Sequence, residues 1–152
     1  MTPLSTLLNL LWMLFGGIHM ALGWLIAALV MAVTVIGLPF AAAAFRLAHY
    51  TLAPFGRTAV SRDDAGLSPS AIGGVAGTVA NVLWFVLAGW WLALGHLVTA
   101  LVLALTLIGI PFAWAHVKLA GLAVWPLGKV VIADGELDTI RHRQPVQGPG
   151  RR

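Results

Sequence analysis

The chain has 152 residues, of which 60% are hydrophobic and only 9% are charged, and it contains no cysteine. A soluble domain usually carries about 25% charged residues, so this composition excludes an ordinary water-soluble fold, and the missing cysteines exclude disulfides and thiolate metal sites. The net charge of +4 does not indicate nucleic-acid binding, because the basic residues follow the apolar segments, where a membrane protein meets the cytoplasm.

The first long leg, residues 9–35, is a continuous apolar segment rich in Leu, Ala and Met. At ~1.5 Å per residue a helix of this length would measure about 40 Å, more than the ~30 Å hydrocarbon core of a bilayer. It must therefore tilt, bend or protrude, and Gly16, Gly17 and Gly23 offer places to bend. The N-terminus lacks the basic region and cleavage site of a secretory signal, so this segment is expected to stay in the mature protein.

A break follows the first long leg at Thr34-Val35-Ile36-Gly37-Leu38-Pro39-Phe40. Pro39 cannot donate a helical hydrogen bond and disfavours helix at the residue before it. Gly37 permits a turn, and the hydroxyl of Thr34 can satisfy a backbone group that the break leaves free. Pro39 is then well placed at the start of a second, shorter helix, residues 39–53.

Residues 57–72 form a polar linker rich in turn-forming residues. The plan then repeats: a long leg at 81–107, a break at Gly109 and Pro111, and a short leg at 111–125. The tail, residues 131–152, is polar, and past about residue 143 we expect it to be largely disordered.

The two membrane segments are copies of one unit. Aligning residues 9–57 with 81–129 at an offset of 72 gives 23 identities in 49 positions without a gap. Such self-similarity indicates a tandem duplication. We predict an all-α polytopic membrane protein of two tandem repeats, each with a long transmembrane helix, a Gly-x-Pro break and a shorter helix that spans partly or lies in the interface. The expected divisions are a first repeat at 1–57, a linker at 58–76, a second repeat at 77–130 and a cytoplasmic tail at 131–152.

Two topologies are compatible with this pattern. Each unit either crosses twice as a hairpin, or crosses once with its short leg in the interface, which would make the repeats inverted. Basic residues after both short legs favour hairpins, because the linker and both termini would then share the cytoplasmic side. Arg46 and Lys118, at equivalent positions within the short legs, would be costly against lipid and are expected to reach the interface.

The sequence offers no catalytic constellation. Neither apolar region contains an Asp or Glu, and no nucleophile–base pair is evident. The histidines within the repeats, His19, His49, His96 and His116, have no common helical spacing, and we interpret them as interfacial or packing residues. The expectation is a protein that is not an enzyme and that has no cofactor and no metal site.

The breaks are the stronger candidates for a site. A helix that begins inside a membrane directs free N–H groups and a positive dipole end toward an anion, although a simple hairpin turn needs no ligand. The repeated asparagines are also candidates, as helix caps or at a pore mouth. The candidate ion- or ligand-binding residues are Gly37, Pro39, Phe40, Gly109, Pro111, Phe112, Arg46, Lys118, Asn9 and Asn81.

Several motifs of the second unit occur together in one known family. They are Asn81-x-Leu83-Trp84, the segment Gly89 to His96, Ile108-Gly109-Ile110-Pro111-Phe112, Lys118, and Trp125-Pro126-Leu127-Gly128. The chain resembles the YccF-type inner-membrane component family of bacteria over about residues 5–132. The first unit departs from the pattern, with His19 and Met20 where the second has Trp91 and Leu92. The resemblance implies a small multi-pass inner-membrane protein of two domain copies, and it implies no activity and no functional residues.

Two functions follow from these features. The first is a small homo-oligomeric channel or transporter for small ions, with anions as the candidate class, since four short spans enclose too little of a pathway alone. The alternative is a non-transporting scaffold or accessory subunit whose basic tail binds a cytoplasmic partner or anionic lipid. Deleting residues 133–152 should spare the first activity and abolish the second. The lipid bilayer is the expected partner in both, and nucleic acid in neither.

Overall fold

The computed structural model describes residues 2–34, 37–68 and 74–143 of the chain. The elements of the first unit are α1 (Pro3–Trp12), the π-helical segment η1 (Met13–Gly17), α2 (Ile18–Ala32), α3 (Leu38–Leu52) and β1 (Arg57–Ser61). Those of the second are α4 (Gly74–Trp84), the π-helical segment η2 (Phe85–Gly89), α5 (Trp90–Ala104), α6 (Ile110–Val124), β2 (Lys129–Ala133) and α7 (Asp134–Arg143).

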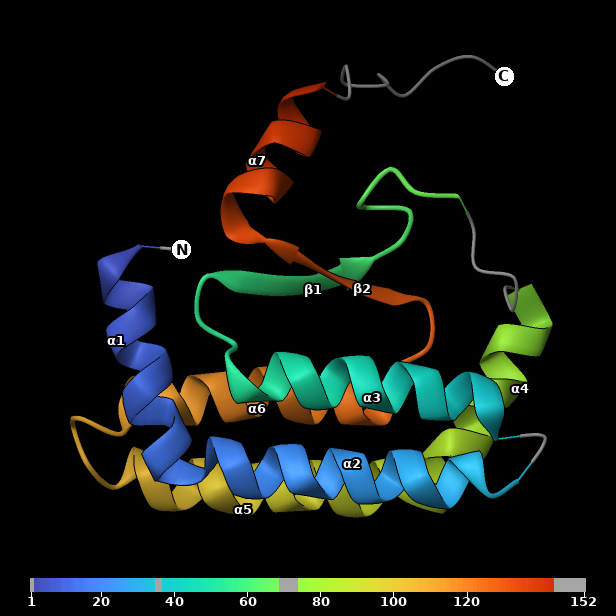
Figure 1. Ribbon diagram of the computed structural model, residues 1–152, viewed down its shortest axis with the longest axis horizontal. Coiled ribbons are helices and arrows are strands. Elements are labelled where there is room, and N and C mark those ends of the chain that lie inside the picture. The colour runs from blue at the N-terminus through green and yellow to red at the C-terminus, as the bar shows by residue number, and fades with distance from the viewer. Residues whose placement is uncertain (1, 35–36, 69–73, 144–152) are drawn as a thin grey trace.

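Each long leg bends instead of running straight. The continuous helical stretches Pro3–Ala32 and Gly74–Ala104 are long and apolar enough to cross a membrane, but each changes direction at its π-helical segment (Figure 1). In the first leg the bend passes through Gly16 at φ 129°, a conformation that glycine adopts readily. At the equivalent position the second leg has Ala88, within a π-helical turn that bends without a positive φ.

Each long leg then folds back on its short leg as a hairpin. At the first turn the Thr34 hydroxyl accepts from Gly37 N at 3.0 Å and donates to Met31 O at 3.0 Å. Thr106 closes the second turn in the same way with Gly109 and Leu103. A side chain on either glycine would collide with the carbonyl oxygen of Met31 or Leu103, so the tight turn requires glycine.

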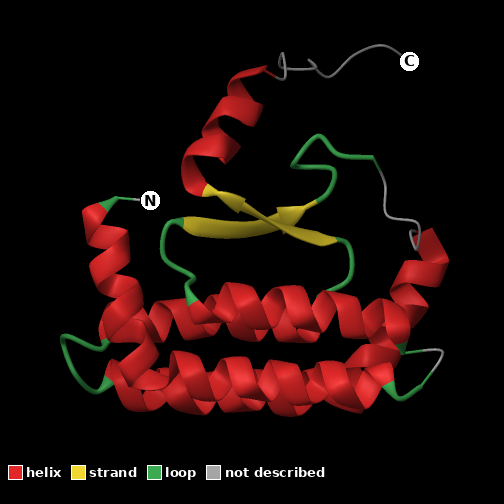
Figure 2. Cartoon of the chain, viewed as in Figure 1, coloured by secondary structure: helices red, strands yellow, loops and turns green. Residues whose placement is uncertain are grey.

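The elements form layers, as Figures 1 and 2 show. Helices α2 and α5 make one layer, α3 and α6 lie on it, the two strands cover α3 and α6, and α7 extends beyond the sheet. The two hairpins run in opposite directions, so their turns lie at opposite ends of the molecule, and α1 and α4 rise at those ends toward the sheet side (Figure 1). Both ends of each unit therefore lie on the sheet side of the helical layers.

A pseudo-two-fold axis relates the two units. The strands β1 and β2 occupy equivalent positions in the repeat and pair antiparallel, with Ala59 opposite Val131, its own equivalent at the offset of 72. In the core, Trp24 donates from Nε1 to His96 Nε2 at 3.1 Å, again between positions 72 apart. Two equivalent residues can meet in this way only near the axis, so the axis passes through the sheet centre and the helical core.

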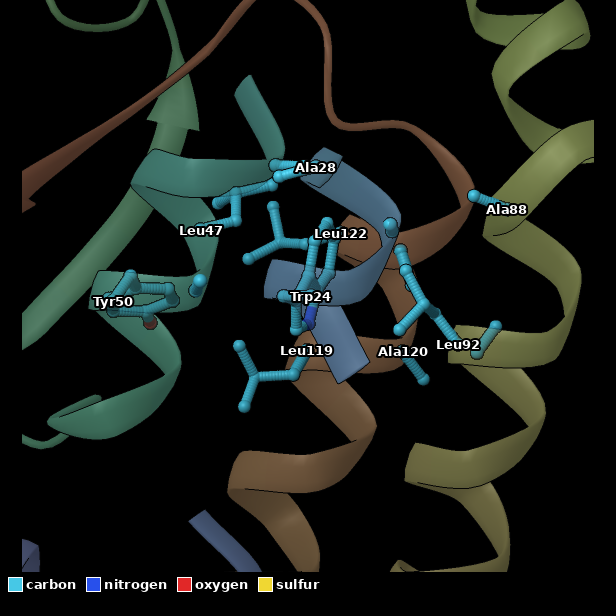
Figure 3. Close-up of a cluster of buried hydrophobic side chains, with 14 of the residues drawn as sticks. Trp24, Ala28, Leu47, Tyr50, Ala88, Leu92, Leu119, Ala120 and Leu122 are labelled. Carbon is cyan, nitrogen blue, oxygen red and sulfur yellow. The ribbon is translucent and has the colours of Figure 1, made fainter. Parts of the chain in front are cut away.

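Aromatic side chains join the two units across the core. Phe40 of the first unit stacks on Trp84 of the second, with ring centroids 6.2 Å apart, and Phe112 stacks on Trp12 at 6.5 Å. Around the axis the core is formed by Trp24 together with smaller residues of both units, including Leu47, Ala88, Leu92, Leu119 and Leu122 (Figure 3).

The structure confirms the predicted class: the chain is mostly helical, with two long apolar helices repeated in tandem and a minor two-stranded sheet. The short legs begin and end one residue earlier than predicted. In both units the short leg packs back along the long leg. The two strands were not predicted: β1 and β2 lie at the start of the linker and of the tail and pair with each other across the duplication. The next part of the tail forms α7. The expected disorder beyond residue 143 lies outside the described residues.

Candidate binding site beneath the two-stranded sheet

Two hydrogen-bonded anchors in each unit position the short helix and the strand that follows it. Trp12 Nε1 donates to Thr51 O at 2.6 Å, and Trp84 Nε1 donates to Ala123 O at 2.7 Å. Each of these two bonds lies at the end of the short helix of its unit, where the last carbonyl groups have no partner within the helix. The anchors thereby fix the turn from which each strand enters the sheet.

The repeated asparagines form the second anchor. Asn9 accepts from Phe55 N at 3.0 Å and donates to Phe55 O at 3.1 Å, and Asn81 accepts from Leu127 N at 3.1 Å. Both asparagines are buried inside their helices, and Thr2 is the cap of α1. The prediction that Asn9 caps its helix is therefore wrong, since its side chain binds the turn after the short leg.

A cavity of about 550 Å³ lies between α3, the strands and the start of α7. One part of its lining is basic, with Arg46 on α3, Arg57 at the start of β1 and Lys129 at the start of β2. The rest of the lining is mostly apolar, with His49, Tyr50 and the carboxylate of Glu136 as its polar members. The apolar residues are Ala43, Phe45, Leu47, Pro126, Val130, Val131, Ile132 and Ala133. Such an arrangement of a charged group beside an apolar wall suits an amphipathic anion.

Tyr50 lies beneath the sheet and connects α3 to β1. Its hydroxyl donates to Arg57 O at 3.3 Å. Burial raises the pKa of Tyr50 to about 12, with Asp134 adding to the rise and Arg57 opposing it. Tyr50, which lies outside the two candidate spans, is thus a neutral donor at neutral pH, and it holds the Arg57 backbone at the edge of the cavity.

The pseudo-symmetric counterpart of this cavity is smaller, and its lining has lysine and no arginine. It has a volume of about 340 Å³ and lies between α6 and the sheet, where Lys118 takes the place of Arg46. At the positions of His49 and Tyr50 the second unit has Gly121 and Leu122. The duplication therefore provides two similar cavities, and the first has arginines at the positions where the second has lysines.

Two histidines meet in the centre of the helical core. His96 on α5 and His116 on α6 are both buried, and their Nδ1 atoms lie 2.9 Å apart. Because Trp24 donates to His96 Nε2, a neutral His96 carries its proton on Nδ1 and donates it to His116. Sequence reasoning missed this pair, since residues 20 positions apart on two antiparallel helices share no local spacing.

This donor chain does not suit a metal. A metal ion held by both Nδ1 atoms would require a proton on His96 Nε2, which would then face the N–H of Trp24. Among the described residues there is also no group of three or more His, Cys, Asp or Glu side chains close enough to hold an ion. We interpret the pair as a hydrogen-bonded contact that orients α5, α6 and Trp24.

The structure separates the sequence-predicted candidates into three groups. Arg46 and Lys118 are exposed on the short helices and line the two cavities beneath the sheet. The breaks, Gly37 with Pro39 and Gly109 with Pro111, lie at opposite ends of the molecule, so the two helix starts do not face one another (Figure 1). Phe40, Phe112, Asn9 and Asn81 are buried residues that join the units or anchor their turns.

These features define an integral membrane protein made of two tandem copies of one bent helical hairpin. The family model of the inner membrane component domain, YccF, matches the chain twice, at residues 7–57 and 79–129, and the chain belongs to this family. Inner membrane protein YccF of Escherichia coli (strain K12) is 35% identical over 133 residues, which cover 86% of this chain and 88% of that protein. The protein of the same name from Shigella flexneri matches to the same extent. No solved structure matches the chain.

Proposed function

We propose that this protein is an accessory component of the inner membrane whose basic face, formed by the short helices, the sheet and α7, lies against the anionic cytoplasmic leaflet. In this role the helices hold the protein in the bilayer, and the sheet face contacts lipid headgroups. This proposal moves the contact from the basic tail predicted from the sequence to the face that the cavities occupy.

The observation that carries this proposal is the distribution of charge. Helices α1, α2, α4 and α5 and both π-helical segments contain no Asp, Glu, Lys or Arg. Every charged residue of the elements belongs to α3, α6, the strands or α7, which lie on the sheet side of the α2 and α5 layer (Figure 1). Large apolar side chains are exposed along the uncharged helices, as a lipid-facing surface requires. Basic residues near the surface gain about 1 kcal/mol each from an anionic leaflet.

Single cysteines test this orientation without a background signal, because the natural chain has none. We would place one at Asp63, in the loop after β1, and one at Asp138, on α7, both of which are exposed. A membrane-impermeant maleimide should label both variants in inverted membrane vesicles and neither in intact spheroplasts. The cysteine-free parent serves as the control.

Two outcomes of this labelling would contradict the proposal. Labelling of both positions only in intact spheroplasts would place the basic face on the periplasmic side. Labelling of the two positions from opposite sides would mean that each unit crosses once and that the repeats are inverted. Both results would remove the cytoplasmic contact surface.

The second candidate is the homo-oligomeric channel or transporter, with anions as the candidate class. It is favoured by the cations at equivalent positions, Arg46 and Lys118, which border cavities on one face. Flux from liposomes with separate anion and cation gradients distinguishes the two functions. The accessory role predicts no flux above that of empty liposomes. Selective flux that changes in the double variant Arg46→Ala, Lys118→Ala would instead support a pathway.

A further inference from the structure

We propose that the cavity between α3 and the strands binds a single anionic phospholipid, with its phosphate at Arg46, Arg57 and Lys129 and its acyl chains leaving along Phe45. This inference deepens the proposed function and rests on it for the position of the sheet face at the membrane surface. It specifies the site and the chemical class of its ligand.

The lining charges favour an anion that offers several acceptor oxygens. Three permanent cations, Arg46, Arg57 and Lys129, line the cavity, against one carboxylate, Glu136. Guanidinium groups present paired N–H donors that match a phosphate geometrically, which a lysine ammonium does not. Both arginines of this lining are lysines at the equivalent positions of the second unit, Lys118 and Lys129. The first cavity is therefore the better phosphate site.

The apolar part of the cavity favours a lipid over a free phosphate. Phe45 is 62% exposed on α3 beside Arg46, and Leu47, Val130 and Ile132 line the same space. A volume of about 550 Å³ is within the usual range for small-molecule sites, roughly 300–1,000 Å³. It suits a glycerophosphate headgroup with the first part of its chains. The rest of the chains would then continue over the exposed apolar surface of the helices.

Native mass spectrometry of the purified full chain in detergent tests this site directly. Phosphatidylglycerol and phosphatidylcholine of matched chain length would be titrated separately, together with glycerol 1-phosphate as the headgroup alone. We expect one phosphatidylglycerol to bind in preference to phosphatidylcholine, and glycerol 1-phosphate to bind far more weakly. In the double variant Arg46→Ala, Arg57→Ala, the affinity for phosphatidylglycerol should fall by at least about tenfold, because charge-assisted hydrogen bonds are lost.

Two further variants make the result specific. Lys118→Ala removes the equivalent cation from the second cavity and should leave the affinity unchanged. Glu136→Gln removes the opposing carboxylate from an exposed position, so it should fold normally and bind phosphatidylglycerol more tightly. This variant keeps the test informative if the arginine variant fails to fold.

Three outcomes would overturn the inference: equal binding of the two lipids, unchanged affinity in both the arginine and the glutamate variants, or equally tight binding of glycerol 1-phosphate. The last would assign the cavity to a soluble phosphate. If phosphatidylglycerol does not bind but maleimide labels the single cysteines only from the cytoplasmic side, the lipid site is refuted and the orientation stands. If maleimide labels them from the periplasmic side, the proposed orientation is refuted.

Discussion

Replacing Trp84 by alanine is expected to lower the free energy of unfolding by about 3–5 kcal/mol, the usual cost of removing a large aromatic side chain from a core. Trp84 has no exposed surface, and its ring stacks between Trp24 and Phe40, with centroids 5.9 and 6.2 Å away. Its Nε1 also donates to Ala123 O at the end of α6. The substitution therefore removes an inter-unit contact and an anchor of the second strand.

The measurement is unfolding of the purified protein in mixed micelles by a denaturing detergent, followed by circular dichroism. Trp90→Ala provides the matched control, because Trp90 is on the same leg but is 51% exposed. Its loss should shift the midpoint little. Similar shifts for the two variants would mean that Trp84 is not a core residue. Trp12→Ala should behave as Trp84→Ala does, since the two occupy equivalent positions.

Replacing His96 by phenylalanine is expected to be the second most damaging change. The ring fits the space approximately, but the variant leaves Trp24 Nε1–H and His116 Nδ1 without partners in the core. A buried polar group that loses its only partner costs about 1–3 kcal/mol, and here two such groups are affected. The detergent-unfolding midpoint should fall accordingly.

Two variants separate the hydrogen bonds of His96 from its packing. His96→Gln keeps one acceptor and one donor on a side chain of suitable length, so it should recover part of the lost stability. His49→Phe changes an exposed histidine and should have little effect. If His96→Phe proved as stable as the parent, the donor chain from Trp24 to His116 would contribute nothing to the fold.

The hairpins could be predicted because their determinants are local. A threonine, a glycine three residues later and a proline two beyond that close each turn within seven positions, as Thr34, Gly37 and Pro39 show. The same pattern occurs in both units, which strengthens the prediction. The long apolar legs also required a bend, and Gly16 provides it in the first leg. These features depend on neighbours in the sequence, which a pattern can reveal.

The sheet could not be predicted in the same way, since its pairing joins residues about 70 positions apart. Each strand is five residues long and contains a charged residue, so neither has the alternation that identifies a strand by itself. A signal was nevertheless present: Arg57 and Lys129 each follow a Pro-x-Gly turn at the same point of the repeat. The tight turn at Gly56 and Gly128, both at φ 83°, directs each strand over the short helices.

Only part of the candidate site could be predicted from the sequence. Arg46 and Lys118 were identified because a charge in an apolar helix is conspicuous, and both line cavities. Arg57, Lys129 and Tyr50 were not, because their contribution depends on the sheet that brings them over α3. The breaks were favoured because a helix start attracts an anion, but the antiparallel hairpins place the two starts at opposite ends of the molecule (Figure 1), where they do not form a shared site.

The central claim is that the two copies form one pseudo-symmetric body, joined by strands that cover the basic cavities. The most direct test of this claim is disulfide formation, in native membranes, in variants that carry one cysteine on β1 and one on β2. Ala59→Cys with Val131→Cys should cross-link readily, because directly opposed residues in an antiparallel pair have Cβ atoms about 4.5–5.5 Å apart. Val60→Cys with Val131→Cys should not, because those side chains point to opposite faces. Failure of the first pair, or equal cross-linking of both, would contradict the shared sheet.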